Sequence, residues 1–259
     1  MESESSHQHP MHSKLTNHDS ILTIPILPAE LVIEILSRLP MKSLLQFTCV
    51  SKSWLSLISS PEFIKTHLSL SANNKGYTHH KVMMSSYSRL TSNVKVCSLR
   101  SLFYDSITEA FDLDCPMLSY ERYRYDEVSF IVSVNGLICL LIRDNDYFIW
   151  NPSIRKYKKL PKPRTTKLVI YRTVSGFGYD EFHDDYKVVM VNFYDCADDG
   201  EVKIYSLKSD SWRSVDNGGR VLANGQGMFV NGKLHWAASD GYCFNHKSKI
   251  IMTSLKNLG

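Results

Sequence analysis

The sequence predicts an α+β chain of more than one domain, with a small helical module first and an all-β domain after it. Three observations support this fold class. Apolar residues recur with helical spacing between Leu31 and Leu39. No strong helical period follows residue 70. From residue 129 onward, turn signals recur at intervals of roughly 48 residues, which is typical of a chain built from structural repeats.

The composition is that of an ordinary soluble protein. The chain has 259 residues, of which 43% are hydrophobic and 22% charged, enough for one or two domains with a sizeable core. Its net charge of +4 is too small to indicate a nucleic-acid partner by itself. The six cysteines include no Cys-x-x-Cys pair, and neither a signal peptide nor a membrane-spanning stretch is present. We therefore expect reduced thiols, no membrane partner, and a location in the cytoplasm, the nucleus or both.

Residues 1–20 form a polar leader with four histidines. Such a tract can bind metal, but its flexible spacing and the lack of a nearby cysteine or carboxylate cluster favour a disordered tail. Residues 21–26 are expected to lead into the helical module as an extended strap.

Residues 21–70 make up the predicted helical module. Its first helix is expected between Pro28, which suits a first turn, and Pro40, which stops it. Because Ile33 lies off the main apolar stripe, this helix should be buried on two sides. Three helices provide only a small core. The surplus apolar surface therefore indicates a partner.

Two further helices complete this module. Ser43 is expected to cap the second, and the third should span about Ser51 to Ser59. One more helical turn is expected after Pro61.

This module resembles an F-box. The resemblance rests on Leu27-Pro28, Glu34-Ile35-Leu36-Ser37-Arg38-Leu39-Pro40, Lys42-Ser43-Leu44-Leu45, Cys49-Val50-Ser51-Lys52-Ser53-Trp54 and Pro61-Glu62-Phe63. One departure is Ser51, where family members usually have cysteine. The resemblance implies docking on the Skp-type adaptor of a cullin-based (SCF) ubiquitin ligase, whereas an ordinary three-helix bundle is the alternative. The residues that it assigns to the adaptor contact are Leu27, Pro28, Leu31, Ile35, Leu36, Leu44 and Trp54. The first six would offer apolar knobs, and Trp54 would hold the third helix against them or touch the adaptor.

Residues 71–128 are interpreted as a linker and the first strands of the second domain. The small, polar residues 71–76 are the clearest linker. Strands are expected at His80–Tyr87 and Val94–Phe103. Residues 104–128 are acidic, aromatic and irregular, and no element is assigned to them.

Residues 129–259 contain the repeats. Hairpin turns are expected at Asn135-Gly136, Asp180–Asp185 and Asn231-Gly232. Two further hairpins each carry two aromatics seven residues apart, namely Trp150 with Tyr157 and Tyr205 with Trp212. Two hairpins per repeat make a four-stranded blade, the unit of a kelch-like β-propeller.

The same region resembles the F-box-associated domain (kelch-like, type 1) of a large plant family that includes S-locus F-box proteins. The matching pieces include Val134-Asn135-Gly136-Leu137, Trp150-Asn151-Pro152, Gly176-Phe177-Gly178-Tyr179-Asp180 and Val230-Asn231-Gly232-Lys233-Leu234-His235-Trp236. Family members typically run on for further repeats, so we expect an incomplete propeller whose last repeat is cut short, from a truncated product or an incomplete gene model.

The evidence for a catalytic or metal-binding site in this region is weak. Asp180–Asp185 could suggest a metal or acid–base cluster, but its position between two strands favours a turn. A basic run is interpreted as a solvated connection between blades, with a surface for an acidic substrate or nucleic acid as the sharper alternative. The run comprises Arg155, Lys156, Lys158, Lys159, Lys162, Arg164 and Lys167. No catalytic, cofactor-binding or metal-binding residue is assigned.

The function implied by the two resemblances is that of a non-catalytic substrate receptor. Its partners would be the Skp-type adaptor, through it cullin, and an unidentified target protein that becomes ubiquitinated and degraded. The alternative is a truncated decoy that binds the adaptor but recruits no substrate. A propeller enzyme such as a glycosidase would need paired carboxylates, and no such constellation is readable.

Overall fold

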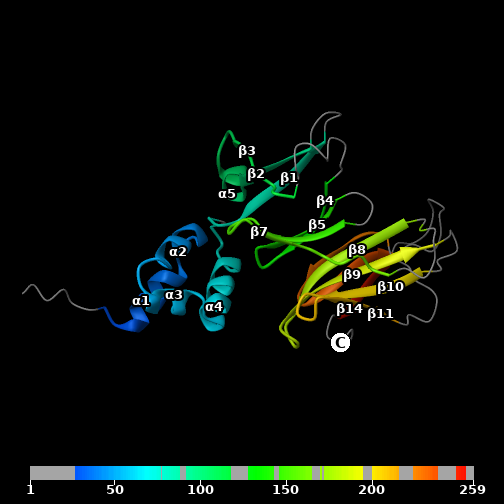
Figure 1. Ribbon diagram of the computed structural model, residues 1–259. Coiled ribbons are helices and arrows are strands. Elements are labelled where there is room, and N and C mark those ends of the chain that lie inside the picture. The colour runs from blue at the N-terminus through cyan, green and yellow to red at the C-terminus, as the bar shows by residue number, and fades with distance from the viewer. Residues whose placement is uncertain are drawn as a thin grey trace, which may run out of the picture.

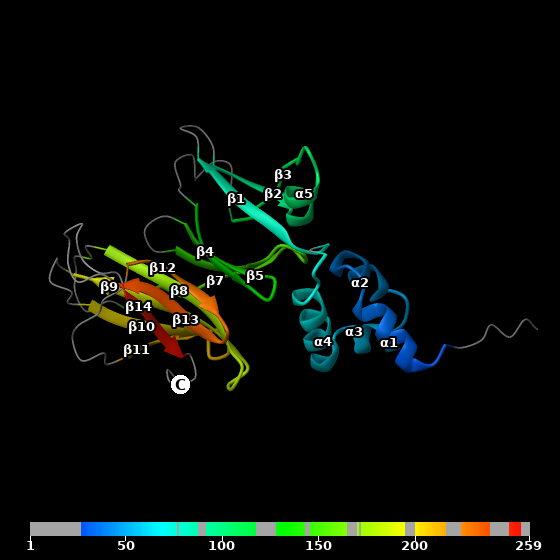
Figure 2. The same cartoon turned by 180° about the vertical axis from the view of Figure 1, so that it is seen from behind.

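The computed structural model describes residues 27–76, 78–87, 92–117, 128–142, 146–164, 170, 172–194, 200–215, 224–238 and 249–254. The predicted leader (1–20) and strap (21–26) lie outside these residues. Figure 1 shows the helical module at one end of the molecule and the β sheets at the other, and Figure 2 shows the same separation from behind.

The helical module contains α1 (Ala29–Ser37), α2 (Met41–Phe47), α3 (Lys52–Ile58) and α4 (Pro61–Ala72). Pro28 and Pro40 precede α1 and α2 as N-caps, so the predicted role of Pro28 at the helix start is confirmed. Ser43 lies inside α2 and does not cap it, because Pro40 already begins that helix. Ser51 does cap α3, since its side chain accepts a hydrogen bond from the Trp54 N–H at 3.2 Å.

Helix α4 is longer than the single turn predicted from the sequence. It runs for 12 residues and includes the first two residues of the predicted linker. Ser60 caps its N-terminus by accepting a hydrogen bond from the Phe63 N–H. Pro61 occupies the first turn, where a backbone N–H would have no partner within the helix, so its absence costs little. At the middle of α4, His67 Nε2 lies 2.9 Å from the Leu39 carbonyl oxygen, which ties this helix to the end of α1.

A small antiparallel sheet follows, made of β1 (Lys81–Tyr87), β2 (Ser92–Ser98) and β3 (Phe111–Asp112). The predicted strand Val94–Phe103 is wrong in its second half, because residues 99–104 form the helix α5 (Leu99–Tyr104). Ser98 ends the strand and caps this helix by accepting from the Ser101 N–H. The apolar side chains of this segment are compatible with a strand, but the Ser98 cap favours a helix.

Two four-stranded antiparallel units come next, and their predicted hairpins are confirmed. The first blade is β4 (Val128–Val134), β5 (Leu137–Ile142), β6 (Asp146–Asn151) and β7 (Lys156–Lys159). The second blade is β8 (Arg172–Asp180), β9 (Asp185–Phe193), β10 (Gly200–Ser206) and β11 (Ser211–Val215). A third unit, here the third blade, has the described strands β12 (Asn224–Val230), β13 (Lys233–Ala238) and β14 (Lys249–Ser254).

Turn chemistry sets the register of these hairpins. Asn135 and Gly136 both have positive φ, as do Asn231 and Gly232, which is the geometry of the two-residue turns that suit twisted strands. In the outer hairpins the paired aromatics lie directly opposite each other, Trp150 against Tyr157 and Tyr205 against Trp212.

The first strands of the three blades, β4, β8 and β12, contact one another. Strands β8 and β12 are joined in parallel through the pair Gly176 and Gly227, so the second and third blades form one seven-stranded sheet in the order β11-β10-β9-β8-β12-β13-β14. A buried hydrogen bond of 2.6 Å between Tyr147 Oη on β6 and Ser175 Oγ on β8 links the first two blades. This arrangement, with one strand of each blade meeting its neighbours, is consistent with a propeller-like domain.

Candidate functional site

Helix α1 carries apolar side chains on two faces. The inward face places Leu36 in the core of the helical module, with Val32 and Leu39 packed against it. The outward face carries Leu31 and Ile35, which are 46% and 52% exposed. Because helix residues four apart share a face, these two side chains form one row. The predicted double-faced first helix is therefore confirmed.

The row continues beyond the helix. Leu27, four residues before Leu31, is 54% exposed, and Pro28 beside it is also exposed. We call Leu27, Pro28, Leu31 and Ile35 the α1 face. Its nearest ion pair is Glu34 with Arg38, whose side-chain atoms lie 3.0 Å apart and neutralise each other in solvent. The α1 face is thus an apolar strip, bordered by the exposed Glu30 and by the Glu34–Arg38 pair.

Two of the predicted contact residues lie elsewhere. Leu36 and Leu44 are each 1% exposed and form the core with Ile58 and Phe63. Their side chains cannot act as surface knobs in this conformation, which corrects the prediction for these two. The physical reason is the helical period: Leu36 follows Ile35 by one residue, so it points about 100° away, toward the core.

Trp54 packs inside the helical module, and its contact with the adaptor stays a prediction. It is half-buried, packs against the same core, and meets Phe47 edge to face with ring centroids 5.6 Å apart. Sequence reasoning missed Val50 and Leu55, which are both exposed on this module. Leu55 directly follows Trp54 on α3, so helical geometry could have indicated that only one of them faces the core.

In the β domain, the acidic segment at residues 180–185 forms the predicted turn between β8 and β9. The buried Asp180 carboxylate accepts hydrogen bonds from the Phe182 and His183 N–H groups, from Lys187 Nζ at 2.6 Å and from His183 Nδ1 at 2.6 Å. Burial alone would raise the pKa of Asp180, but the hydrogen bonds from Lys187 and His183 outweigh it and lower the pKa to about 2. This carboxylate fastens the turn.

The described residues contain no group of three or more histidine, cysteine or acidic side chains placed to hold a metal ion. Within those same ranges, no helix is long and apolar enough to cross a membrane.

The comparisons with known proteins agree with this architecture. A model of the F-box associated beta propeller domain matches residues 81–254, and a model of the F-box domain matches residues 24–66. The chain therefore belongs to the F-box associated β-propeller family and carries an F-box ahead of that domain. Both resemblances drawn from the sequence are confirmed.

Among its relatives is the F-box/kelch-repeat protein At3g23880 of Arabidopsis thaliana, which is 34% identical over 82% of this chain and 59% of the relative. Two others from the same plant are the putative F-box protein At3g16210, 30% identical over 85% of this chain and 57% of the relative, and the F-box protein CPR1, 30% identical over 81% and 53%. The chain thus spans between half and three-fifths of the length of these relatives.

Proposed function

We propose that this protein is a substrate-receptor subunit of an SCF-type ubiquitin ligase. The α1 face would dock on a Skp-type adaptor, and through it on cullin. The β domain would hold a target protein for ubiquitination and degradation. The observation that carries the proposal is the α1 face itself, a row of apolar side chains about half exposed on a helix whose other face is already buried.

Such a subunit would do no bond chemistry of its own. It would raise the effective concentration of the target beside the ubiquitin-charged enzyme, which accelerates transfer by proximity. The cytoplasm and nucleus, where ubiquitin ligases of this type work, are the proposed locations. Neither nucleic acid nor a membrane is a proposed partner.

Two features of the β domain support the receptor over an adaptor-binding decoy. The first blade is a four-stranded sheet, and the second blade is part of a seven-stranded sheet. One buried core, which includes Phe177, Val188 and Tyr205, continues between them, so a rigid scaffold is present. Within the described residues, tight turns close hairpins in each blade, for example at 135–136, 181–184 and 231–232. Such a rigid frame is the kind on which recognition loops are usually carried.

The test is adaptor binding by a variant of the α1 face. Leu31→Asp combined with Ile35→Asp places two charges on the apolar strip. We expect co-purification with a plant Skp-type adaptor to be lost, because burying unpaired carboxylates costs several kcal/mol. Size-exclusion chromatography would show the complex for the unaltered chain and separate peaks for the variant.

The single variant Leu70→Asp is a matched control for the single variant Ile35→Asp. Both replace an exposed apolar helix residue with aspartate, but Leu70 lies on α4, beyond the residues that match the F-box domain. We expect Leu70→Asp to keep adaptor binding. If the double variant of the α1 face still binds, the assignment of this face is wrong.

A further inference from the structure

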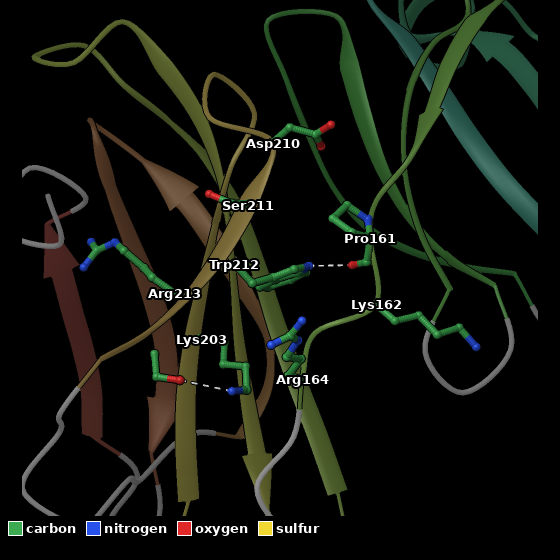
Figure 3. Close-up of a pocket in the computed structure, with 9 residues that line it drawn as sticks. Pro161, Lys162, Arg164, Lys203, Asp210, Ser211, Trp212 and Arg213 are labelled. Atoms are coloured by element: carbon green, nitrogen blue, oxygen red, sulfur yellow. Dashed lines mark hydrogen bonds between the residues drawn. The ribbon is translucent and has the colours of Figure 1, made fainter.

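A cavity of about 420 Å³ lies between the first two blades (Figure 3). One wall is the connection that follows β7, and the other is the β10–β11 hairpin. Its volume falls within the range of ligand pockets in proteins. The residues that line it are Pro161, Lys162, Arg164, Lys203, Asp210, Ser211, Trp212, Arg213 and Ser214.

Trp212 gives this cavity a fixed wall. Its indole Nε1 donates a hydrogen bond of 2.6 Å to the Pro161 carbonyl oxygen across the cavity rim. Its ring also packs against Tyr205 and Tyr147, with centroids 5.4 and 5.8 Å away. Because Tyr147 belongs to the first blade and Trp212 to the second, the contact holds both walls in place. The pocket is therefore formed before any ligand arrives.

Most charges around the cavity are already neutralised. Lys203 Nζ lies 2.6 Å from Glu201 and donates to Ser214 Oγ at 3.0 Å. The Asp210 carboxylate forms an ion pair with Lys158, whose Nζ lies 2.9 Å from Asp210 Oδ1. The hydrogen bond from Tyr205 and then that from Lys158 lower the pKa of Asp210, so it stays ionised and paired.

Arg164 is the exception. Within the part of the chain that the structure describes, no carboxylate pairs with its guanidinium, and Figure 3 shows the side chain pointing toward the Trp212 ring. Lys162, on the same connection, pairs only loosely with Asp146, at 3.7 Å, and its side chain is 73% exposed. The net field at the Trp212 wall is thus positive.

Arg213 offers a natural comparison. It lies opposite Ile204 in the β10–β11 pairing, whereas Trp212 lies opposite Tyr205 and Ser214 opposite Lys203. Neighbouring residues of a strand point to opposite faces, so the Arg213 side chain leaves on the far side from the Trp212 ring. Arg213 is among the residues that line the pocket, but Figure 3 shows its guanidinium directed away from the Trp212 ring.

We propose that this pocket binds an acidic side chain from a peptide segment of the target protein. Arg164 would bind the anionic group through its planar guanidinium, which matches carboxylate and phosphate oxygens two at a time. Lys162 would add positive field, and the Trp212 ring would cover the apolar stem of the bound side chain. A single aromatic ring lines the pocket, which favours a side chain over a run of stacked bases. This proposal rests on the proposed receptor function, because it names the class of target.

Fluorescence anisotropy with short labelled peptides tests the proposal on the full chain. The probes are a peptide of alternating glutamate and alanine, its glutamine counterpart, and a glutamine peptide with one phosphoserine. A short single-stranded DNA serves as the nucleic-acid probe. We expect the glutamate peptide to bind and the glutamine peptide not to. The phosphoserine peptide distinguishes a phosphate from a carboxylate as the preferred source of the anion.

The variants decide where the peptide binds. Loss of a hydrogen bond to a charged group should weaken binding about tenfold or more in Arg164→Gln. Arg213→Gln removes the same charge at the edge of the pocket, from a side chain on the opposite face of β11 from Trp212. We therefore expect less than about a twofold change, since only general attraction is lost. Equal losses in both variants, no binding of either anionic peptide, or Arg164-dependent binding of DNA alone would overturn the proposal.

Adaptor co-purification with the same variants separates the two proposals. Arg164→Gln should keep the adaptor, because Arg164 lies outside the F-box. A chain that binds the glutamate peptide but no adaptor would refute the receptor function and leave the pocket. A chain that binds the adaptor but neither anionic peptide would refute the pocket proposal and leave the receptor function standing.

Discussion

At the scale of single residues, Asp180 shows how a charged side chain can be buried in this fold. Its carboxylate is enclosed, and the Lys187 ammonium that pairs with it is enclosed too. A buried pair of this kind is stable only when both partners and their remaining hydrogen-bonding positions are satisfied. Here two backbone N–H groups and His183 complete the shell. A cluster that resembles an acid–base site in the sequence is therefore a fastener for a turn.

This arrangement predicts a specific pH dependence. The pKa of Asp180 is about 2 in the folded chain, against a usual value of 3.8. The stabilisation is fully present above the unfolded value and is lost as the pH falls through the folded one, and it amounts to roughly 2 kcal/mol. Urea unfolding of the unaltered chain and of Asp180→Asn should therefore differ most above pH ~4, and the difference should shrink toward pH ~2.

The variant also tests the pairing with Lys187. Above pH ~4 it leaves a buried ammonium without its counter-charge, which should cost about 3 kcal/mol or more. Glu181→Gln, an exposed acidic residue of the same turn, is the control and should change stability by less than about 0.5 kcal/mol. A constant difference between Asp180→Asn and the unaltered chain across this pH range would contradict the assigned pKa.

At the scale of the elements, Trp236 explains why glycines stand where the second and third blades meet. A β-carbon at Gly176 would lie 2.8 Å from the Trp236 ring, and one at Gly227 would lie 2.5 Å from it. Both distances are too short for any side chain. Trp236, on β13, therefore packs over the backbone of β8 and β12, and the two glycines allow those strands to approach in parallel.

Gly227→Ala should therefore destabilise the β domain. The added methyl must displace a buried indole, and overpacking of this kind usually costs about 1–3 kcal/mol. Chemical unfolding followed by far-ultraviolet circular dichroism measures the loss without depending on tryptophan fluorescence.

Combining Gly227→Ala with Trp236→Phe isolates the cause. The smaller ring makes room for the methyl, so the double variant should lose less stability than the sum of the two single variants. Strict additivity would mean that the glycine is required for its backbone and not for the space it leaves.

At the scale of the whole molecule, the helical module and the β domain differ in the size of their buried hydrophobic cores. The described core of the helical module consists of Leu36, Leu44, Ile58 and Phe63 with a few half-buried neighbours. The first two blades share a larger core that continues from one sheet to the next. One described ion pair joins the two ends, Lys65 with Asp184 at 4.0 Å, and both side chains are largely exposed. Such a pair contributes little to stability.

Hydrogen exchange should show this difference directly. We expect the amides of α1 and α3 to exchange at least about tenfold faster than those of β5 and β9, because regions with few buried contacts open at a lower free energy. Addition of the adaptor should slow exchange in α1 and leave the β strands unchanged, since binding stabilises the state that it recognises.

Two results would contradict these expectations. Equal protection in the helices and the strands of the free chain would mean that they unfold as one cooperative unit. Protection by the adaptor in β5 or β9 would place its binding site on the β domain.

Much of the fold could be predicted because its signals are local. The Asn-Gly turns, the alternation of β strands and the aromatic pairs seven residues apart each depend on neighbours in the sequence. The predictions that failed concern segments whose residues are compatible with two local structures, and the hydrophobic pattern alone does not distinguish them. Residues 99–104 are apolar enough for a strand, but Ser98 caps a helix there. Helix α4 extended past its expected end into the first residues of the linker.

The candidate site was predictable only in part, for a related reason. Periodicity indicated that α1 had two apolar faces, but the packing of Leu44, Ile58 and Phe63 determined which one was covered. Leu36 and Leu44 were assigned to the contact and proved to be core. The Trp212 pocket was not found, because its walls come from parts of the chain about 50 residues apart.

The sequence by itself determined the family, the order of the two domains and the positions of the hairpin turns, since these follow from motifs and from the preferences of adjacent residues. The tertiary structure decided which side of α1 is free, where Asp180 directs its charge, and that Arg164 faces a tryptophan wall. These features depend on contacts between elements far apart in the chain. Burial and pairing are properties of that packing, and no single segment of the sequence contains them.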